Sequence, residues 1–208
     1  MIKLPRWASI DPEVQKKLDA ISVDLRPKRW YGRAKAVVNF KDEILIQGRL
    51  IQQERCAWCT LPLGAEGRRT VHRDHIAPSS LYPQWTFVAK NLVISCEYCN
   101  GLAVKSDIDT IKELKHTYDD CEFHIVHPYD DEVELHIQFD NDRDQLPVVI
   151  KGISPKGLWT VRNMKLDDAG LARERAKEVF YEQRGQLRLP AQEEDLIVSA
   201  LDAMNVAL

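Results

Sequence analysis

Two cysteine pairs of identical spacing carry the most specific chemical signal in the sequence. Cys56 and Cys59 form one C-x-x-C pair, and Cys96 and Cys99 form the other. Four thiolates at this spacing can supply a closed tetrahedral zinc site. Such a site has no open coordination position, so we expect the ion to stabilise the fold, by on the order of 10 kcal/mol, rather than to catalyse. Taken alone, the two pairs would also suit a purely structural zinc ribbon.

A second group of polar residues lies between and just after these pairs. Asp74 and His75 end a segment, residues 70–75, whose alternating pattern predicts a strand, and Asn100 directly follows Cys99. Imidazole has an unperturbed pKa of about 6.5, which suits proton transfer near neutral pH. Carboxylate and amide oxygens are hard ligands that suit magnesium or manganese. The zinc pairs are therefore accompanied by residues suited to hydrolytic chemistry.

The order of these residues resembles the motif of the HNH, or ββα-metal, endonucleases. That motif runs C-x-x-C, Asp-His-Ile-x-Pro, Asn-Leu, then C-x-x-C-Asn with a lysine shortly after, and it matches this chain from Cys56 to Lys105. The resemblance implies a treble-clef-like core of two strands and a helix, with Zn2+ at its base and a catalytic Mg2+ or Mn2+. It also implies hydrolysis of phosphodiester bonds, most often in DNA.

The same resemblance assigns a role to each residue of the motif. His75 would be the general base that activates water, and Asp74 and Asn100 would ligate the catalytic Mg2+ or Mn2+. Asn91 would fix the loop that aims His75, although an asparagine in a turn is an equally good explanation. Asn100 departs from the histidine that many members have there, so we expect weaker metal binding and an unchanged reaction class. His72 would share the face of Asp74, as a supporting residue or as a neutral surface histidine.

Contacts with nucleic acid must come from local patches, because the net charge is −3. Basic residues flank the motif or accompany two aromatic residues that could stack on bases. The predicted contacts are Arg68, Arg69, Arg73 and Lys105 near the motif, and Arg29 and Arg33 beside Trp30 and Tyr31. The alternative is that these charges are solvated and that the aromatic residues anchor the core.

The hydrophobic pattern divides the chain into three regions of an α+β protein. Residues 1–54 form an N-terminal helical region, residues 55–118 the zinc-bound module, and residues 119–208 a C-terminal α+β region. Helices are expected at residues 13–21 (capped by Asp11), 40–53, 109–118, from 167 onward and at 192–204. A small antiparallel sheet is expected within residues 122–150, and a further strand at 158–161.

The C-terminal region carries a second, looser resemblance. His127-Pro128-Tyr129-Asp130-Asp131 and Gly157-Leu158-Trp159 are similar to segments in the HNH subunit of Septu-type antiphage systems, including retron-associated ones. This resemblance implies an ABC-type ATPase partner, docked by residues 119–208, and in retron systems a reverse transcriptase with its RNA–DNA hybrid. The sequence has no nucleotide-binding loop, which agrees with ATP chemistry on another chain.

The remaining features concern location and the competing hypothesis. No apolar run is long enough to span a bilayer and no secretory signal is evident, so we expect a cytoplasmic protein without membrane contact. The fifth cysteine, Cys121, is expected to be a small buried hydrophobe. The rival function is a non-catalytic subunit that binds nucleic acid or docks an ATPase, but such a subunit would not need Asp74, His75 and Asn100 together.

Overall fold

The chain is a mixed α+β protein with small antiparallel sheets. The computed structural model describes residues 1–64, 70–102, 104–139 and 148–183. The described helices are α1 (Pro12–Asp19), α2 (Arg26–Trp30), α3 (Lys35–Ile51), α4 (Glu97–Asn100), α5 (Pro155–Asn163) and α6 (Ala169–Gln183). The described strands form three antiparallel pairs, β1 (Val71–His75) with β2 (Leu92–Cys96), β3 (Ile111–Glu113) with β4 (Glu122–Phe123), and β5 (Ile137–Phe139) with β6 (Ile150–Gly152).

The N-terminal helices confirm the pattern seen in the sequence. The Asp11 carboxylate accepts hydrogen bonds from the backbone N–H groups of Glu13 and Val14, so α1 begins where the cap predicts. α3 begins five residues earlier than expected, at Lys35 rather than residue 40, and it buries Phe40 and Ile44. These helices bring the basic segment before α3 close to β1.

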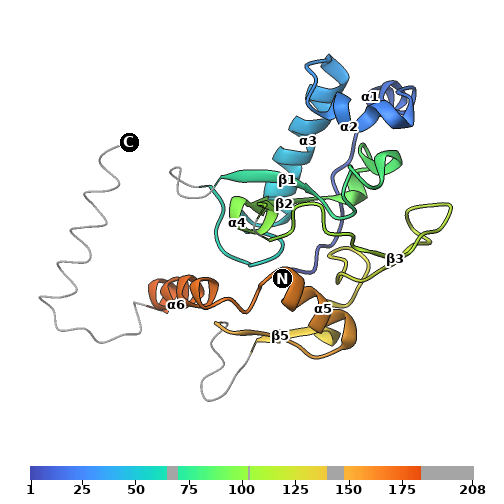
Figure 1. Cartoon of the computed structure of the whole chain (residues 1–208). Helices are drawn as coiled ribbons and strands as arrows, with labels where there is room; N and C mark the ends of the chain where they lie inside the picture. The colour runs from blue at the N-terminus through green and yellow to red at the C-terminus, as the bar shows by residue number, and fades with distance from the viewer. Residues whose placement is uncertain (65–69, 103, 140–147, 184–208) are drawn as a thin grey trace, which may run out of the picture.

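The β1–β2 pair forms the centre of the module, and α3 packs against it (Figure 1). Asp74 pairs with Val93 and His75 with Leu92, so both motif residues lie at the end of β1. β2 is buried along its whole length. α3 approaches β2 at Gly48, where an added Cβ would lie only 2.6 Å from the Ile94 side chain. A glycine is therefore required for this close packing.

The connection from β1 to β2, residues 76–91, folds back over the end of the strand pair. It contains two short 3-10 helices, η3 (Pro83–Trp85) and η4 (Ala89–Asn91). Phe87 from this connection packs edge-on against Phe40 of α3, at 5.6 Å between ring centroids. The connection is thus anchored in the same apolar core as α3.

Two predicted elements of the later chain are wrong. Residues 109–118, expected as a helix, contain β3, because the Asp109 carboxylate accepts from the Ile111 N–H and the Thr110 hydroxyl donates to the Ile76 carbonyl. Residues 158–161, expected as a strand, lie within α5, because the Ser154 side chain caps a helix that starts at Pro155.

The rest of the C-terminal region partly follows the expectation. Strands do occur within residues 122–150, but β4 pairs with β3 and β5 with β6, so they do not join in one sheet. The helix expected from residue 167 onward is α6. The helix expected at residues 192–204 lies outside the described residues. No helix in the described part of the chain has the length and apolar character needed to cross a membrane.

Candidate metal centre and active site

The four predicted zinc ligands come together in one buried cluster. Cys56 and Cys59 lie in the turn after α3, while Cys96 ends β2 and Cys99 lies in α4. All four sulfur atoms lie within 4.8 Å of one another, and those of Cys59 and Cys96 are 3.8 Å apart. Tetrahedral thiolates at Zn–S bonds of about 2.3 Å would also lie about 3.8 Å apart. The donor set therefore fits a zinc ion, as the spacing predicts.

A buried arginine that was not among the predicted site residues supports this cluster. Arg175 of α6 is 2% exposed, and its Nε–H donates to the Cys59 carbonyl at 3.1 Å. Its other N–H groups donate to the carbonyls of Val148 and Leu166. Burial lowers the pKa of Arg175, and the nearby Cys59 thiolate opposes that shift. The sequence does contain a sign that Arg175 is buried, because it lies four residues after Leu171 and so on the apolar face of a predicted helix.

The carboxylate of Asp74 is buried and held from two sides. Asp74 is 1% exposed, and its Oδ2 accepts from the indole N–H of Trp58 at 2.7 Å. Its Oδ1 accepts from the Lys105 ammonium at 2.8 Å. Trp58 lies inside the first cysteine pair, so the Cys cluster and Asp74 are directly connected.

Lys105 corrects one prediction. Its place after the second cysteine pair predicts a contact to nucleic acid, but its side chain is only 2% exposed and pairs with Asp74. Its ammonium also donates to the His75 carbonyl. A buried charge needs a partner because burial removes its hydration, and Asp74 is that partner. Lys105 is therefore an internal residue of the site rather than a surface cation.

The imidazole of His75 is oriented by a backbone carbonyl. Its Nε2 lies 3.0 Å from the Thr86 carbonyl oxygen, and its ring contacts the edge of Trp30 at 4.6 Å between centroids. Because a carbonyl only accepts, Nε2 must carry the proton, so the neutral ring has its lone pair on Nδ1. Burial lowers the pKa of His75 to about 4. The ring is thus neutral at pH 7, with Nδ1 able to accept a proton.

Asn91 is fully buried and joins two parts of the connection between β1 and β2. Its Oδ1 accepts from the Ala77 N–H at 2.7 Å. Its Nδ2 donates to the carbonyls of Ala77, at 3.0 Å, and Trp85, at 3.2 Å. Ala77 lies two residues after His75, and Trp85 immediately precedes Thr86. The amide therefore fixes both backbone segments that position the His75 ring.

Asn100 lies on the same cavity as Asp74 and His75. The cavity has a volume of about 570 Å³, and its walls also include His72, Tyr31, Lys41 and Arg73. The Asn100 amide nitrogen donates to His72 Nδ1 at 3.0 Å, which leaves its amide oxygen for another partner. His72 therefore supports Asn100, and it is not an isolated surface histidine.

The predicted nucleic-acid contacts have different outcomes. Arg29 and Arg33 are exposed, but neither lines the cavity. Arg73 lines it, although its guanidinium is held by the Lys41 carbonyl and by Asp42 at 3.5 Å. Arg68 and Arg69 lie outside the described residues.

The two aromatic residues beside Arg29 and Arg33 separate in the structure. Trp30 is buried against Phe40 and Phe87, as the core alternative predicts, whereas Tyr31 is 85% exposed at the rim of the cavity. The fifth cysteine, Cys121, is half-buried rather than buried, and its sulfur accepts from the Lys115 N–H.

Comparison with known proteins adds no family assignment. No family model matches the chain, and a search of curated protein sequences finds no match either.

Proposed function

We propose that the chain is a metal-dependent HNH endonuclease that hydrolyses phosphodiester bonds of nucleic acid, with DNA as the expected substrate. The observation that carries the proposal is the state of His75. Its Nε2–H is held by the Thr86 carbonyl, its Nδ1 is a neutral acceptor, and Asp74 and Asn100 lie on the wall of the same cavity. The order β1, β2, α4 around a four-cysteine cluster supports the ββα-metal assignment, as does the motif shared with that family.

In this proposal the protein residues divide the reaction between proton transfer and orientation. His75 Nδ1 takes a proton from the attacking water, and the Thr86 carbonyl favours the imidazolium that forms, because it accepts from the opposite nitrogen. Asn91 keeps the ring aimed into the cavity by fixing both flanking backbone segments. A bound Mg2+ or Mn2+ would neutralise charge on the scissile phosphate and stabilise the leaving oxygen.

The polar groups fit such an ion, with one condition. Each Asp74 oxygen accepts one hydrogen bond from a described residue, so each keeps a lone pair, and the Asn100 amide oxygen takes no part in the bond to His72. Asp74 and Asn100 are therefore the candidate ligands. The condition is that Lys105 must share or release Asp74 Oδ1, because its ammonium already neutralises that carboxylate.

We further propose that an ABC-type ATPase controls this nuclease in an antiphage complex, with a reverse transcriptase and its RNA–DNA in a retron system. The resemblance of residues 127–131 to Septu-type HNH subunits supports this partner. The C-terminal region also presents exposed apolar side chains that a docked subunit would cover, including Leu135, Leu158 and Phe180.

The test is cleavage of supercoiled plasmid, linear duplex and single-stranded DNA in Mg2+ or Mn2+, with the chain alone and with its ATPase and ATP. We expect wild-type cleavage, loss of at least about 100-fold in His75→Ala, and retention in His116→Ala, whose histidine is exposed and outside the cavity. Equal cleavage by wild type and His75→Ala would refute the mechanism. Nucleic-acid binding without cleavage would favour the non-catalytic subunit.

A further inference from the structure

The segment from His127 to Asp131 forms a tight loop that fixes the His127 ring. The His127 N–H donates to the Asp131 carboxylate at 2.6 Å, and the Asp131 N–H donates back to the His127 carbonyl at 3.1 Å. The N–H groups of Tyr129 and Asp130 both approach His127 Nδ1 at 3.3 Å. The Asp130 carboxylate also lies 3.2 Å from Nδ1, but the two backbone N–H groups require Nδ1 as an acceptor, so the proton of the neutral ring is on Nε2.

The direction of the next hydrogen bonds follows from this tautomer. His127 Nε2 lies 2.9 Å from the Tyr118 hydroxyl, and that hydroxyl lies 3.1 Å from Asn91 Oδ1. The Asn91 amide oxygen can only accept. The Tyr118 hydroxyl must therefore donate its single proton to that oxygen and accept a hydrogen bond from His127 Nε2. The result is a directed chain from His127 through Tyr118 to Asn91.

This chain runs through the protein interior. His127 is 1% exposed, Tyr118 is 6% exposed and Asn91 is fully buried. Burial lowers the pKa of His127 to about 4, which keeps the ring neutral and so keeps Nδ1 as an acceptor for the backbone N–H groups. Removing the Tyr118 hydroxyl would take the acceptor from His127 Nε2 and would leave Asn91 Oδ1 with the Ala77 N–H as its remaining described donor, since water has little access here.

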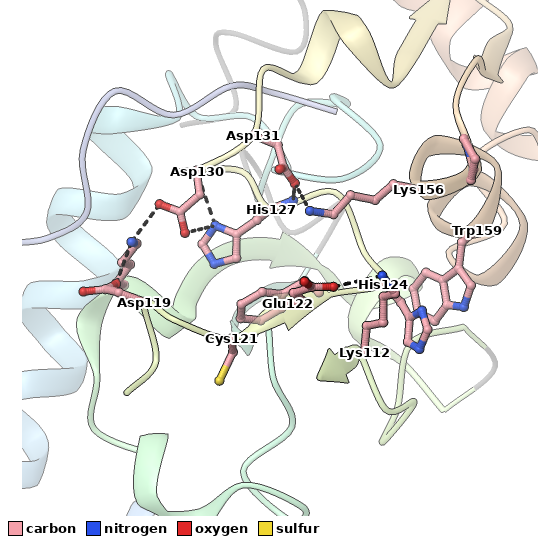
Figure 2. A pocket seen from close by; sticks show the side chains of 13 residues that line it. Lys112, Asp119, Cys121, Glu122, His124, His127, Asp130, Asp131, Lys156 and Trp159 are labelled. Carbon is pink, nitrogen blue, oxygen red and sulfur yellow. Dashed lines mark hydrogen bonds and ion pairs between the residues drawn. The ribbon is translucent and has the colours of Figure 1, made fainter. Parts of the chain in front are cut away.

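Further contacts attach the same segment to the start of β2. The Tyr129 hydroxyl donates to the Leu92 carbonyl at 2.7 Å. The Lys90 ammonium pairs with Asp119 and Asp130, each at 2.7 Å. Figure 2 shows the His127 ring beside the Asp130 carboxylate. Residues within the range 118–130 therefore contact the three consecutive residues Lys90, Asn91 and Leu92.

We propose that Tyr118 and His127 are positioning residues that fix the Asn91 amide, and through it the loop of residues 76–87 that holds His75 against the Thr86 carbonyl. The catalytic consequence rests on the proposed nuclease function, whereas the effect on the loop does not. The five-residue segment from His127 thus acts inside the nuclease module in addition to any role in docking a partner.

The hydroxyl of Tyr118 can be tested without disturbing its ring. Tyr118→Phe keeps the edge contact with Trp85, at 5.2 Å between centroids, and removes the bond to Asn91. Tyr129→Phe is the matched control, because it also removes a tyrosine hydroxyl from this region, but from a half-buried tyrosine that bonds to Leu92. Hydrogen–deuterium exchange of the whole chain is compared for the peptide that contains the Ala77 amide, which donates to Asn91.

We expect Tyr118→Phe to speed exchange at Ala77 by about 10-fold or more, and Tyr129→Phe to change it by less than about twofold. In cleavage assays, Tyr118→Phe should lower kcat by about 10-fold and leave KM unchanged, since Tyr118 does not line the substrate cavity. His127→Gln retains a side-chain N–H donor and should preserve slow exchange, whereas His127→Leu should behave like Tyr118→Phe.

The exchange data decide the inference even if the nuclease proposal fails. Unchanged exchange at Ala77 in Tyr118→Phe, or the same acceleration in Tyr129→Phe, would overturn the positioning role. Faster exchange confined to Tyr118→Phe and His127→Leu would support it. Wild-type protein that cleaves no substrate while showing that pattern would refute the proposed function alone.

Discussion

The indole N–H of Trp58 donates to the buried carboxylate of Asp74 at 2.7 Å. Trp58 lies between Cys56 and Cys59, so a side chain of the first cysteine pair holds the acidic residue of the candidate active site. Both Trp58 and Asp74 are essentially inaccessible to solvent. The candidate zinc site and the candidate hydrolytic site are therefore linked by one hydrogen bond as well as by the β1–β2 pair.

Removing that hydrogen bond should destabilise the protein measurably. Trp58→Phe keeps an aromatic ring but leaves one Asp74 oxygen without its donor, and we expect a loss of about 1–3 kcal/mol, plus a packing cost from the smaller ring. Urea denaturation monitored by circular dichroism measures the change. Trp159→Phe is the control, because Trp159 is half-buried and stacks on His124 instead. An equal loss in both variants would show that the Trp58 N–H has no special role.

The four-cysteine cluster should bind zinc and contribute to folding. Cys96→Ser removes one thiolate, and we expect a loss of several kcal/mol, out of an apparent zinc contribution on the order of 10 kcal/mol. Metal analysis of the purified chain and thermal unfolding with and without a zinc chelator provide the measurements. Cys121→Ser is the matched control, because this cysteine is half-buried outside the cluster. Wild-type protein that holds no metal and is insensitive to chelator would contradict the prediction.

The buried pair of Lys105 and Asp74 should show strong coupling. Lys105→Met leaves the Asp74 carboxylate buried without its cation, and Asp74→Asn leaves the ammonium without its anion. Each single variant should lose about 3–5 kcal/mol of unfolding free energy. The double variant should lose less than the sum by about 2 kcal/mol or more, as urea denaturation would show. Additive losses would mean that the two groups do not stabilise each other.

Stability should fall in mild acid because of two neutral histidines, the buried His127 and the half-buried His75. Burial lowers the pKa values of His75 and His127 to about 4, whereas an unfolded histidine has a pKa of about 6.5. Between these values only the unfolded chain binds the proton, so this contribution is fully present above pH 6.5 and decreases as pH falls toward 4. Each histidine should lower the free energy of unfolding by about 1.4 kcal/mol for each unit by which the pH falls within that window.

The pH prediction is checked by urea denaturation at several pH values between 7 and 4.5. His127→Gln should flatten the dependence relative to wild type, because it removes one titrating group. His116→Gln should not, because His116 is exposed. Acid also protonates cysteine thiolates and weakens metal binding, but that contribution is shared by all three proteins. Identical slopes in wild type and His127→Gln would contradict the prediction.

The sequence determined those features that depend on local spacing. The C-x-x-C pairs, the strand ending in Asp74 and His75, and the Asp11 cap of α1 are set by neighbours a few residues apart, and the structure contains each of them. Local patterns failed at residues 109–118. There the Thr110 side chain bonds to the distant Ile76 carbonyl, and helical periodicity cannot reveal such a contact.

Only the tertiary structure decided how the site residues are held. A lysine after a cysteine pair carries no local sign of burial, so Lys105 was expected at the surface rather than against Asp74. Arg175 lies 116 residues from the Cys59 carbonyl that it bonds to, and the Tyr118 link to Asn91 spans 27 residues. Such contacts depend on the relative placement of segments that are far apart in the sequence. For this reason the sequence indicates which groups could react, and the packing of segments that are distant in the sequence fixes their positions.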